Sequence, residues 1–347
     1  HKGSCRLLSE AGVHVESSQA IEIYTTGGAV VEDGRVKISR DQVEKAIEQT
    51  AKQIRLNAVD PENAIDINFE SPSVTFGTGG QALYVLDYND NTFTRRQADA
   101  EDLKRILTLC EQLDHIDFIT RPVEPDVSED RMDMEKLSIF MQHTRKHMNL
   151  ANLVKIEKLP EILKAVKDPG LISFIASLTV SPLNVVSPTV EKFMAMVEHD
   201  LPVSISSCPQ AGATAPLSEI GELIQVNAEV LSAVVLANLI RPGARVLYRG
   251  IPISSDLFTD GSPRWCQPES IRRVAMAADM TWHYQIPCCG TAAVSDEKQP
   301  NVQALAEKTL SLVFEAASGA QFINSAAGML EQVLTVSPEQ YIIDNQI

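Results

Sequence analysis

Residues 211–216 read Ala-Gly-Ala-Thr-Ala-Pro, and the apolar run Ile224-Gln225-Val226-Asn227-Ala228-Glu229-Val230-Leu231 follows them. The run stops at Arg241-Pro242-Gly243-Ala244, where proline and glycine end a helix. The short apolar segment Arg245-Val246-Leu247-Tyr248 comes next. A loop of small residues, a long helix, a turn and a strand in this order predict one repeat of an α/β barrel.

The same alternation of helix and strand extends over most of the chain. Helical patterns such as residues 302–317 alternate with short apolar strands such as 116–120 and 320–324. We count seven such strands, and residues 74–77 supply an eighth. Eight parallel strands close into a (β/α)8 TIM-type barrel. The alternative is an open doubly wound sheet, but no glycine-rich dinucleotide fingerprint follows the first strand.

The first 70 residues have a different pattern. Asp33-Gly34 separates two short apolar segments and predicts a β-hairpin, and Ser39 is placed to cap the following helix. We therefore expect an N-terminal helical and hairpin accessory region over residues 1–70 and the barrel over residues 71–347. Both ends of the sequence lie inside expected helices, so we expect a fragment with incomplete termini.

Composition narrows the function. The formal net charge of −16 argues against nucleic acid and anionic membranes as partners. No run of about 18 apolar residues is present, so we expect no membrane span. The six cysteines form no CxxC spacing, which favours a reducing, cytoplasmic location.

The active site of a TIM-type barrel lies at the carboxyl ends of its strands. Polar and aromatic side chains at these ends are therefore candidate substrate-binding residues. They are Arg121, Ser207, Gln210, Tyr248, Arg249 and Asn324, with Trp265 in a following loop.

Three blocks resemble the trimethylamine methyltransferase family. They are the loop and helix quoted above, Gly290-Thr291-Ala292-Ala293-Val294-Ser295-Asp296-Glu297-Lys298, and, more weakly, Ala327-Gly328-Met329-Leu330-Glu331. The resemblance implies transfer of a methyl group from an amine to a corrinoid carried by a partner protein, which docks at the barrel mouth.

One position departs from the family pattern. In the trimethylamine branch a pyrrolysine precedes the Ser-Asp pair, and Val294 stands there in this chain. Valine cannot form the amine adduct attributed to pyrrolysine, so the resemblance implies a substrate whose methyl group is already activated. A quaternary amine of the betaine type is such a substrate. Glycine betaine is the default, and proline betaine, carnitine and butyrobetaine are the rivals.

The implied chemistry assigns roles to several residues. Asp296 and Glu331 are candidate catalytic carboxylates beside Val294. Tyr248 and Trp265 offer aromatic faces to the cation, and Arg121 or Arg249 takes a substrate carboxylate. Asp296 also fits a helix N-cap.

Other readings stay open. One is a non-catalytic binding protein on the same barrel, and another is an unrelated barrel lyase or hydrolase. A third is a zinc-dependent corrinoid methyltransferase with Cys208, Cys288 or Cys289 as ligands. Because a quaternary amine needs no Lewis acid, we expect no metal on this chain. A homo-oligomer is possible.

Overall fold

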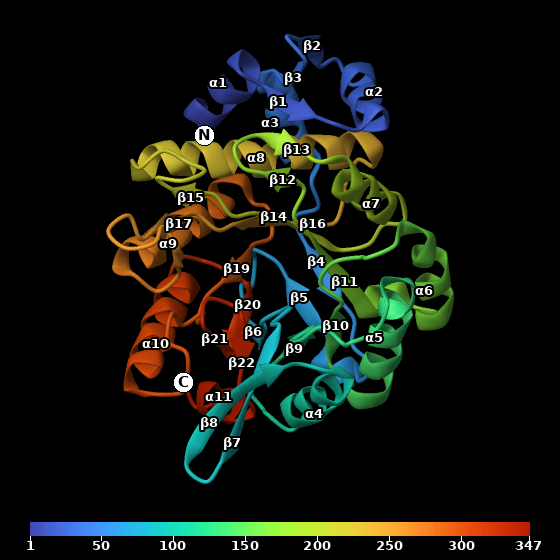
Figure 1. Ribbon diagram of the computed structural model, residues 1–347. Coiled ribbons are helices and arrows are strands. Elements are labelled where there is room, and N and C mark those ends of the chain that lie inside the picture. The colour runs from blue at the N-terminus through green and yellow to red at the C-terminus, as the bar shows by residue number, and fades with distance from the viewer.

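A closed barrel of eight parallel strands forms the centre of the computed structural model, which describes residues 1–347 (Figure 1). In order around the barrel the strands are β6 (Thr75–Thr78), β9 (Phe118–Thr120), β10 (His147–Asn149), β11 (Ile172–Ala176), β14 (Val203–Ser207), β16 (Val246–Gly250), β19 (Cys289–Thr291) and β20 (Phe322–Ala327). β16 and β19 close the ring through a bridge between Tyr248 and Cys288, where Tyr248 N donates to Pro287 O at 2.8 Å. The predicted TIM-type barrel is confirmed.

Helices follow each strand on the outside. They are α4 (Ala100–Glu111), α5 (Glu129–His143), α6 (Leu159–Val166), α7 (Ser187–Glu198), α8 (Glu219–Ile240), α9 (Pro268–Tyr284), α10 (Val302–Ala317) and α11 (Pro338–Asp344). The N-cap of α10 is Asn301, whose side chain accepts from Ala304 N at 2.8 Å. Asp296 is therefore not the N-cap of this helix, and the alternative reading of Asp296 is wrong.

The N-terminal elements form a layer over α8. They are α1 (Lys2–Glu10), β1 (Val13–Val15), α2 (Ser18–Thr26), β2 (Val30–Glu32), β3 (Arg35–Lys37) and α3 (Arg40–Gln49). The hairpin expected at Asp33-Gly34 joins β2 and β3, and Ser39 caps α3 in a capping box with Gln42. A five-stranded sheet unites β2, β3 and β1 with β13 (Asn184–Val185) and β12 (Thr179–Val180).

Helix α8 is enclosed on both sides. It lies between the N-terminal layer and the barrel wall formed by β14 and β16 (Figure 1). An 18-residue window of α8 has a mean hydropathy of 1.8, so this helix is long and apolar enough to cross a membrane. Polar residues such as Asn227 and Glu229 interrupt its apolar run, and 78% of that window is buried inside the protein. A helix that is apolar all round is what a buried position requires.

A short hairpin covers one end of the barrel. β4 (Ile54–Leu56) and β5 (Ile65–Ile67) pair antiparallel, and their apolar side chains pack in one cluster with Phe118, Leu247, Cys289 and Phe322 of the barrel. The rings of Phe118 and Phe322 stack with centroids 3.6 Å apart. These four barrel residues form the lower layer of the interior. Because the amino-terminal end is covered, a ligand must enter from the carboxyl ends of the strands.

Two small sheets complete the fold. β7 (Tyr84–Asn89) and β8 (Thr92–Gln97) form a second hairpin, which joins β22 (Thr335–Val336) and β21 (Met329–Leu330) in a four-stranded sheet. β15 (Gln210–Ala211), β17 (Ile253–Ser255) and β18 (Pro263–Arg264) form a three-stranded sheet. β15 follows the end of β14 and β17 follows the end of β16, so this sheet lies beyond the carboxyl ends of the barrel strands.

Candidate functional site

Polar side chains form a second layer inside the barrel, above the lower layer. Successive side chains of a strand point to opposite faces, so residues two positions apart share a face. The residues two positions after the lower-layer residues therefore also face the interior, as do the residues that pair with them in neighbouring strands. They are Thr120, Asn149, Ser206, Arg249, Thr291 and Asn324. We call these six residues the upper layer. They face the mouth, which is the open carboxyl end of the barrel.

Hydrogen bonds in the upper layer confirm that its side chains meet across the interior. Asn324 Nδ2 donates to Thr120 Oγ1 at 2.6 Å, although β6 lies between their two strands. Arg249 Nη1 donates to Ser206 Oγ at 2.8 Å. Arg249 and Asn324 thus both lie in the upper layer, at the carboxyl end of the barrel.

Several buried polar atoms of this layer have no partner in the protein. They are Nε of Arg249, Nδ2 of Asn149 and Oγ1 of Thr291. A buried polar atom left unpaired costs about 1–3 kcal/mol. A ligand or an ordered water molecule removes that cost, so these atoms mark the part of the interior that is built to bind something polar. The sequence analysis named neither Asn149 nor Thr291 as a candidate, although they end β10 and β19 in the structure.

Arg121 is buried outside this layer. Its Nη2 donates to Glu124 Oε1 at 2.6 Å and to Asn152 Oδ1 at 2.8 Å, and burial lowers its pKa. Thr120 faces the interior, so the next residue, Arg121, points toward the layer of α5. There Lys136 and Asp133 form a buried ion pair with 2.7 Å between Nζ and Oδ1. Arg249 is consequently the better placed of the two arginines for a ligand in the barrel.

Tyr248 does not face the interior. Arg249 points inward, so Tyr248 points outward, and its hydroxyl donates to Asn227 Oδ1 of α8 at 3.2 Å. The side chain is fully buried, and burial raises its pKa well above the usual value. The role of Tyr248 in holding the cation stays a prediction; in the structure helix α8 occupies the side of β16 on which its ring lies.

Ser207 also points toward α8. Its hydroxyl donates to the buried carboxylate of Glu229, and a contact of Ser207 with substrate stays a prediction. Glu229 further accepts from Ser181 Oγ at 2.8 Å and from Leu183 N at 2.9 Å. It therefore ties the loop after β11 to the end of β14. Gln210 opens β15, where its backbone N–H donates to Thr214 Oγ1 at 2.9 Å; a role for its side chain stays a prediction.

The loop after β19 carries Val294 and Asp296. Asp296 accepts from the backbone N–H groups of Trp265 at 3.0 Å and Cys266 at 3.2 Å, and burial raises its pKa. Asp296 thereby joins this loop to the segment before α9. Val294 is buried in the main apolar cluster, and Trp265 packs against that cluster with its indole Nε1 unpaired. Asp296 thus fixes the position of Trp265 rather than standing free in the barrel.

Glu331 is engaged elsewhere. Both of its carboxylate oxygens accept from Arg95 Nη1 at 2.8 Å, and Oε2 accepts from Thr335 Oγ1 at 2.6 Å. Its backbone N–H donates to Glu297 O at 2.7 Å, which supports the loop after β19. A catalytic role for Glu331 stays a prediction; in the structure its carboxylate pairs with an arginine of β8.

The cysteines of the zinc alternative occupy separate environments. Cys289 lies in the lower layer, Cys288 packs outward with Ala278 and Ile323, and Cys208 follows the end of β14. Burial raises the pKa of both the Cys288 and the Cys289 thiol. No group of three or more His, Cys, Asp or Glu side chains is arranged to hold a metal ion. The structure does not assemble the three thiols into one site.

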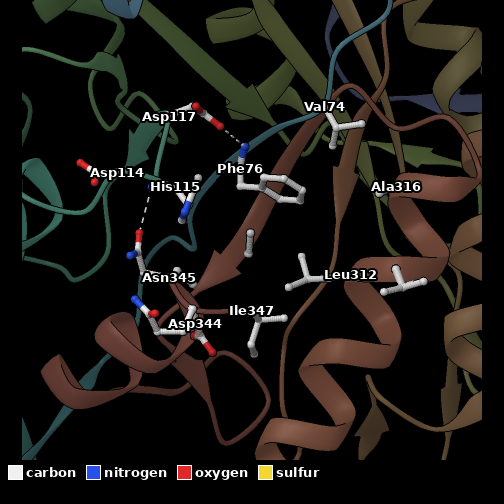
Figure 2. A pocket seen from close by; sticks show the side chains of 15 residues that line it. Val74, Phe76, Asp114, His115, Asp117, Leu312, Ala316, Asp344, Asn345 and Ile347 are labelled. Atoms are coloured by element: carbon white, nitrogen blue, oxygen red, sulfur yellow. Dashed lines mark hydrogen bonds between the residues drawn. The ribbon is translucent and has the colours of Figure 1, made fainter.

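A groove of about 460 Å³ lies between β6, α10 and residues 344–347 (Figure 2). Phe76 of β6 and Leu312 of α10 line it, and the carboxylate of Asp117 accepts from Phe76 N at 2.7 Å. Phe76 points outward from the barrel wall, because its neighbour Gly77 pairs with the inward-facing Phe118. This groove therefore has no access to the upper layer.

The comparisons with known proteins agree with the architecture. A family model described as trimethylamine methyltransferase matches residues 1–347. The chain belongs to the trimethylamine methyltransferase family. Its relatives in this family include proline betaine:corrinoid methyltransferase of Eubacterium limosum, which is 26% identical over all of this chain and 74% of the relative.

Two further relatives are named for different amine substrates. Trimethylamine methyltransferase of Desulfitobacterium hafniense strain DCB-2 is 28% identical over the whole chain and 71% of the relative. Glycine betaine methyltransferase of strain Y51 is 27% identical over the whole chain and 73% of the relative. Among solved structures, monomethylamine methyltransferase of Methanosarcina barkeri superposes with a TM-score of 0.58 at 11% identity, over 99% of this chain and 78% of that one. That likeness supports the fold.

Proposed function

We propose that this chain transfers a methyl group from a betaine, a quaternary ammonium carboxylate, to cobalt of a corrinoid carried by another protein. Membership of a methyltransferase family supports the reaction class. Two relatives named for glycine betaine and proline betaine support the substrate class, and one of those names includes the corrinoid. All six cysteines are free, which fits action in the reducing cytoplasm.

The unpaired Nε of Arg249 is the observation that carries the choice of a carboxylate substrate. This atom has no acceptor inside the barrel, whereas Nη1 of the same guanidinium donates to Ser206 Oγ. Arginine binds carboxylates through two parallel N–H donors. Asn149 Nδ2 and Thr291 Oγ1 supply further donors from β10 and β19. A substrate carboxylate in the upper layer would satisfy all three groups.

The cationic end of a betaine needs a different surface. Its methyl groups form no strong hydrogen bonds, so apolar packing and an aromatic face are suited to them. Val294, in the loop after β19, and Trp265, just before α9, are our candidates for this surface, and Asp296 holds Trp265 in place through its backbone. Trp265 is one of the two aromatic residues that the sequence analysis proposed for the cation.

The protein's part in the chemistry is positioning and the exclusion of water. Holding two reactants in line supplies several kcal/mol of the barrier reduction. The corrinoid, when its protein is docked, supplies the cobalt(I) nucleophile that accepts the methyl group. The C–N bond breaks, its electron pair stays on nitrogen, and a neutral tertiary amine leaves. Because the leaving group is neutral, no side chain has to protonate it.

The test compares substitutions of Arg249 in a spectroscopic assay of cob(I)alamin methylation. Loss of a charged hydrogen-bonded contact corresponds to about 1.5–3 kcal/mol, or roughly 10-fold to 100-fold in KM. We expect R249M to raise KM for glycine betaine and proline betaine by this factor, and R249K to raise it less. The exposed Arg272, which pairs with Glu219, gives the matched control R272M, which should leave KM unchanged.

Two results contradict the proposal. If R249M has the KM of the wild type for betaines, the carboxylate does not bind at Arg249. If the wild type methylates cob(I)alamin from trimethylamine but not from any betaine, the substrate class is wrong.

A further inference from the structure

A small cavity lies between α9, α10 and the loop after β19. Its volume is about 20 Å³, and Trp265, Val294 and Glu315 are among the residues that line it. A space of about 10–15 Å³ holds one water molecule, so this cavity has room for water and none for a substrate. Trp265 and Val294 are also our candidates for the surface that meets the cationic end of a betaine.

Glu315 reaches this cavity from α10. The residue is 3% exposed, its Oε1 accepts from Thr291 N at 3.4 Å, and its Oε2 has no partner in the protein. Gly290 leaves the space that the carboxyl group occupies, because a Cβ at that position would lie 2.6 Å from Oε1. An unpaired carboxyl oxygen in the interior costs free energy, so Oε2 indicates that a polar molecule belongs in the cavity.

Trp265 supplies a second unpaired group to the same cavity. Its indole Nε1 is buried and donates to no protein atom, whereas Nε1 of Trp282 donates to Gly319 O at 3.0 Å. Asp296 fixes only the backbone of Trp265, through the 3.0 Å hydrogen bond from Trp265 N. No hydrogen bond within the protein therefore sets the orientation of the indole ring.

We propose that one ordered water molecule in this cavity links Glu315 to the indole of Trp265, which makes Glu315 a positioning residue for the ring. Where it concerns substrate, this inference rests on the proposed function, since that function assigns Trp265 to the cation. The water oxygen accepts from Trp265 Nε1 and shares a hydrogen bond with Glu315 Oε2. A buried water molecule needs two to four polar partners, and Thr291 and Ser311 also line the cavity.

Glu315 also changes its charge near neutral pH. Burial raises its pKa to about 8, although the Thr291 N–H and the charge of Arg249 act in the opposite direction. Burial raises the pKa of the nearby thiols as well, so they keep their protons at pH 8. The charged and titratable groups around the cavity are Arg249 of β16, Cys288 and Cys289 of β19, Lys308 of α10, and Cys266 and Asp296 in the adjoining loops.

Tryptophan fluorescence tests the link without any substrate. The chain has two tryptophans, so the variant W282F reports Trp265 alone. We expect its emission to shift between about pH 6 and pH 10 with a midpoint near 8, because a negative charge then forms one water molecule away from the indole nitrogen. The double variant W282F/E315Q should lack this shift. An identical pH profile in both proteins would overturn the link.

Glu222 provides the matched control. It is a buried glutamate on α8 whose pKa burial raises to about 7, and it does not line the cavity. W282F/E222Q should therefore keep the shift near pH 8 that W282F shows. Loss of the shift in W282F/E222Q would assign it to Glu222 and overturn the role of Glu315.

Kinetics separate positioning of the ring from simple packing. E315Q keeps the shape and the hydrogen-bonding atoms of the neutral acid, so KM for a betaine at neutral pH should stay within about 2-fold of the wild type. E315L cannot hold the water molecule and should raise KM by about 3-fold to 10-fold, with a smaller change in kcat. An unchanged KM in E315L would show that Glu315 does not position Trp265 for the substrate.

A crystal structure of the wild type at neutral pH observes the water directly. We expect it within about 3.2 Å of both Trp265 Nε1 and Glu315 Oε2, and we expect E315L to lack it. A direct contact between the two side chains, or no water between them, would overturn the proposal. Fluorescence and crystallography need no substrate, so both remain decisive if no betaine methylates cob(I)alamin and only the proposed function fails.

Discussion

Replacement of Glu229 should destabilise the protein far more than replacement of Glu222 on the same helix. Both carboxylates are buried in α8. Glu229 accepts hydrogen bonds from Ser207, Ser181, Leu183 and Gln225, the last at 3.1 Å. Glu222 accepts no hydrogen bond from a side chain and lies 3.3 Å from Arg273 Nε.

The magnitude follows from these contacts. A hydrogen bond to a charged group contributes about 1.5–3 kcal/mol, and contributions that share one acceptor are not additive. We therefore expect E229A to lower the free energy of unfolding by about 4–6 kcal/mol. E229Q should lower the free energy of unfolding by about 2–4 kcal/mol, because the N–H₂ group of the glutamine would face the groups that donate hydrogen bonds to Glu229. Typical proteins are stable by about 5–15 kcal/mol, so E229A brings this chain close to unfolding at 25 °C.

Glu222 provides the matched control. Burial raises its pKa to about 7, so part of the population carries a neutral carboxyl group at neutral pH. E222Q retains that neutral shape and should stay within about 1 kcal/mol of the wild type. Urea unfolding followed by circular dichroism measures both variants at one pH. If E229A and E222Q differ by less than 1 kcal/mol, Glu229 does not hold the loops together as described.

Two further predictions concern buried groups beside the barrel wall. Y248F loses the hydrogen bond to Asn227 and should lower the free energy of unfolding by about 1 kcal/mol, whereas Y248A should lower it by about 3–5 kcal/mol. Neither variant should change KM for a betaine in assays of the folded protein. A raised KM in both variants would show that Tyr248 contacts the substrate. Burial raises the pKa of Glu315 from 4.5 to about 8, so the folded protein favours the neutral acid and wild-type stability falls as pH rises through that window. E315Q should remove this fall in stability, which is on the order of 4 kcal/mol. Urea unfolding of the wild type and E315Q at pH 5.5 and 8.5 measures it, and an equal change of unfolding free energy with pH in both proteins would contradict the prediction.

The barrel was predictable from sequence because its repeats have strong local signals. Alternating helix and strand periods, a proline-glycine stop and a capping serine each act over a few residues. Helix α10 has the bounds that its periodicity predicts. The ends of the strands follow from the same pattern, so the edge of the barrel that carries the site was predictable as well.

The face of each strand was not predictable. Tyr248 and Arg249 are neighbours in a strand that is covered on both sides, and a sequence that is apolar on both faces does not reveal its phase. The difference of one residue places Arg249 in the interior and Tyr248 against α8. Partners distant in sequence are equally hidden: Glu331 pairs with Arg95, which is 236 positions away. No local pattern distinguishes such a carboxylate from a catalytic one.

The enclosure of α8 has a consequence for synthesis of the chain. Residues 1–50 leave the ribosome long before residues 219–240, and the surface on which they pack is made by that later helix. The early segments must therefore wait without their main partner while more than half of the chain is translated. When α8 emerges, its length and mean hydropathy are those of a membrane-spanning helix until the N-terminal layer packs on it. Shortening the N-terminal layer would then leave the nascent helix exposed to chaperones and to membrane-insertion machinery, rather than merely weakening the finished protein.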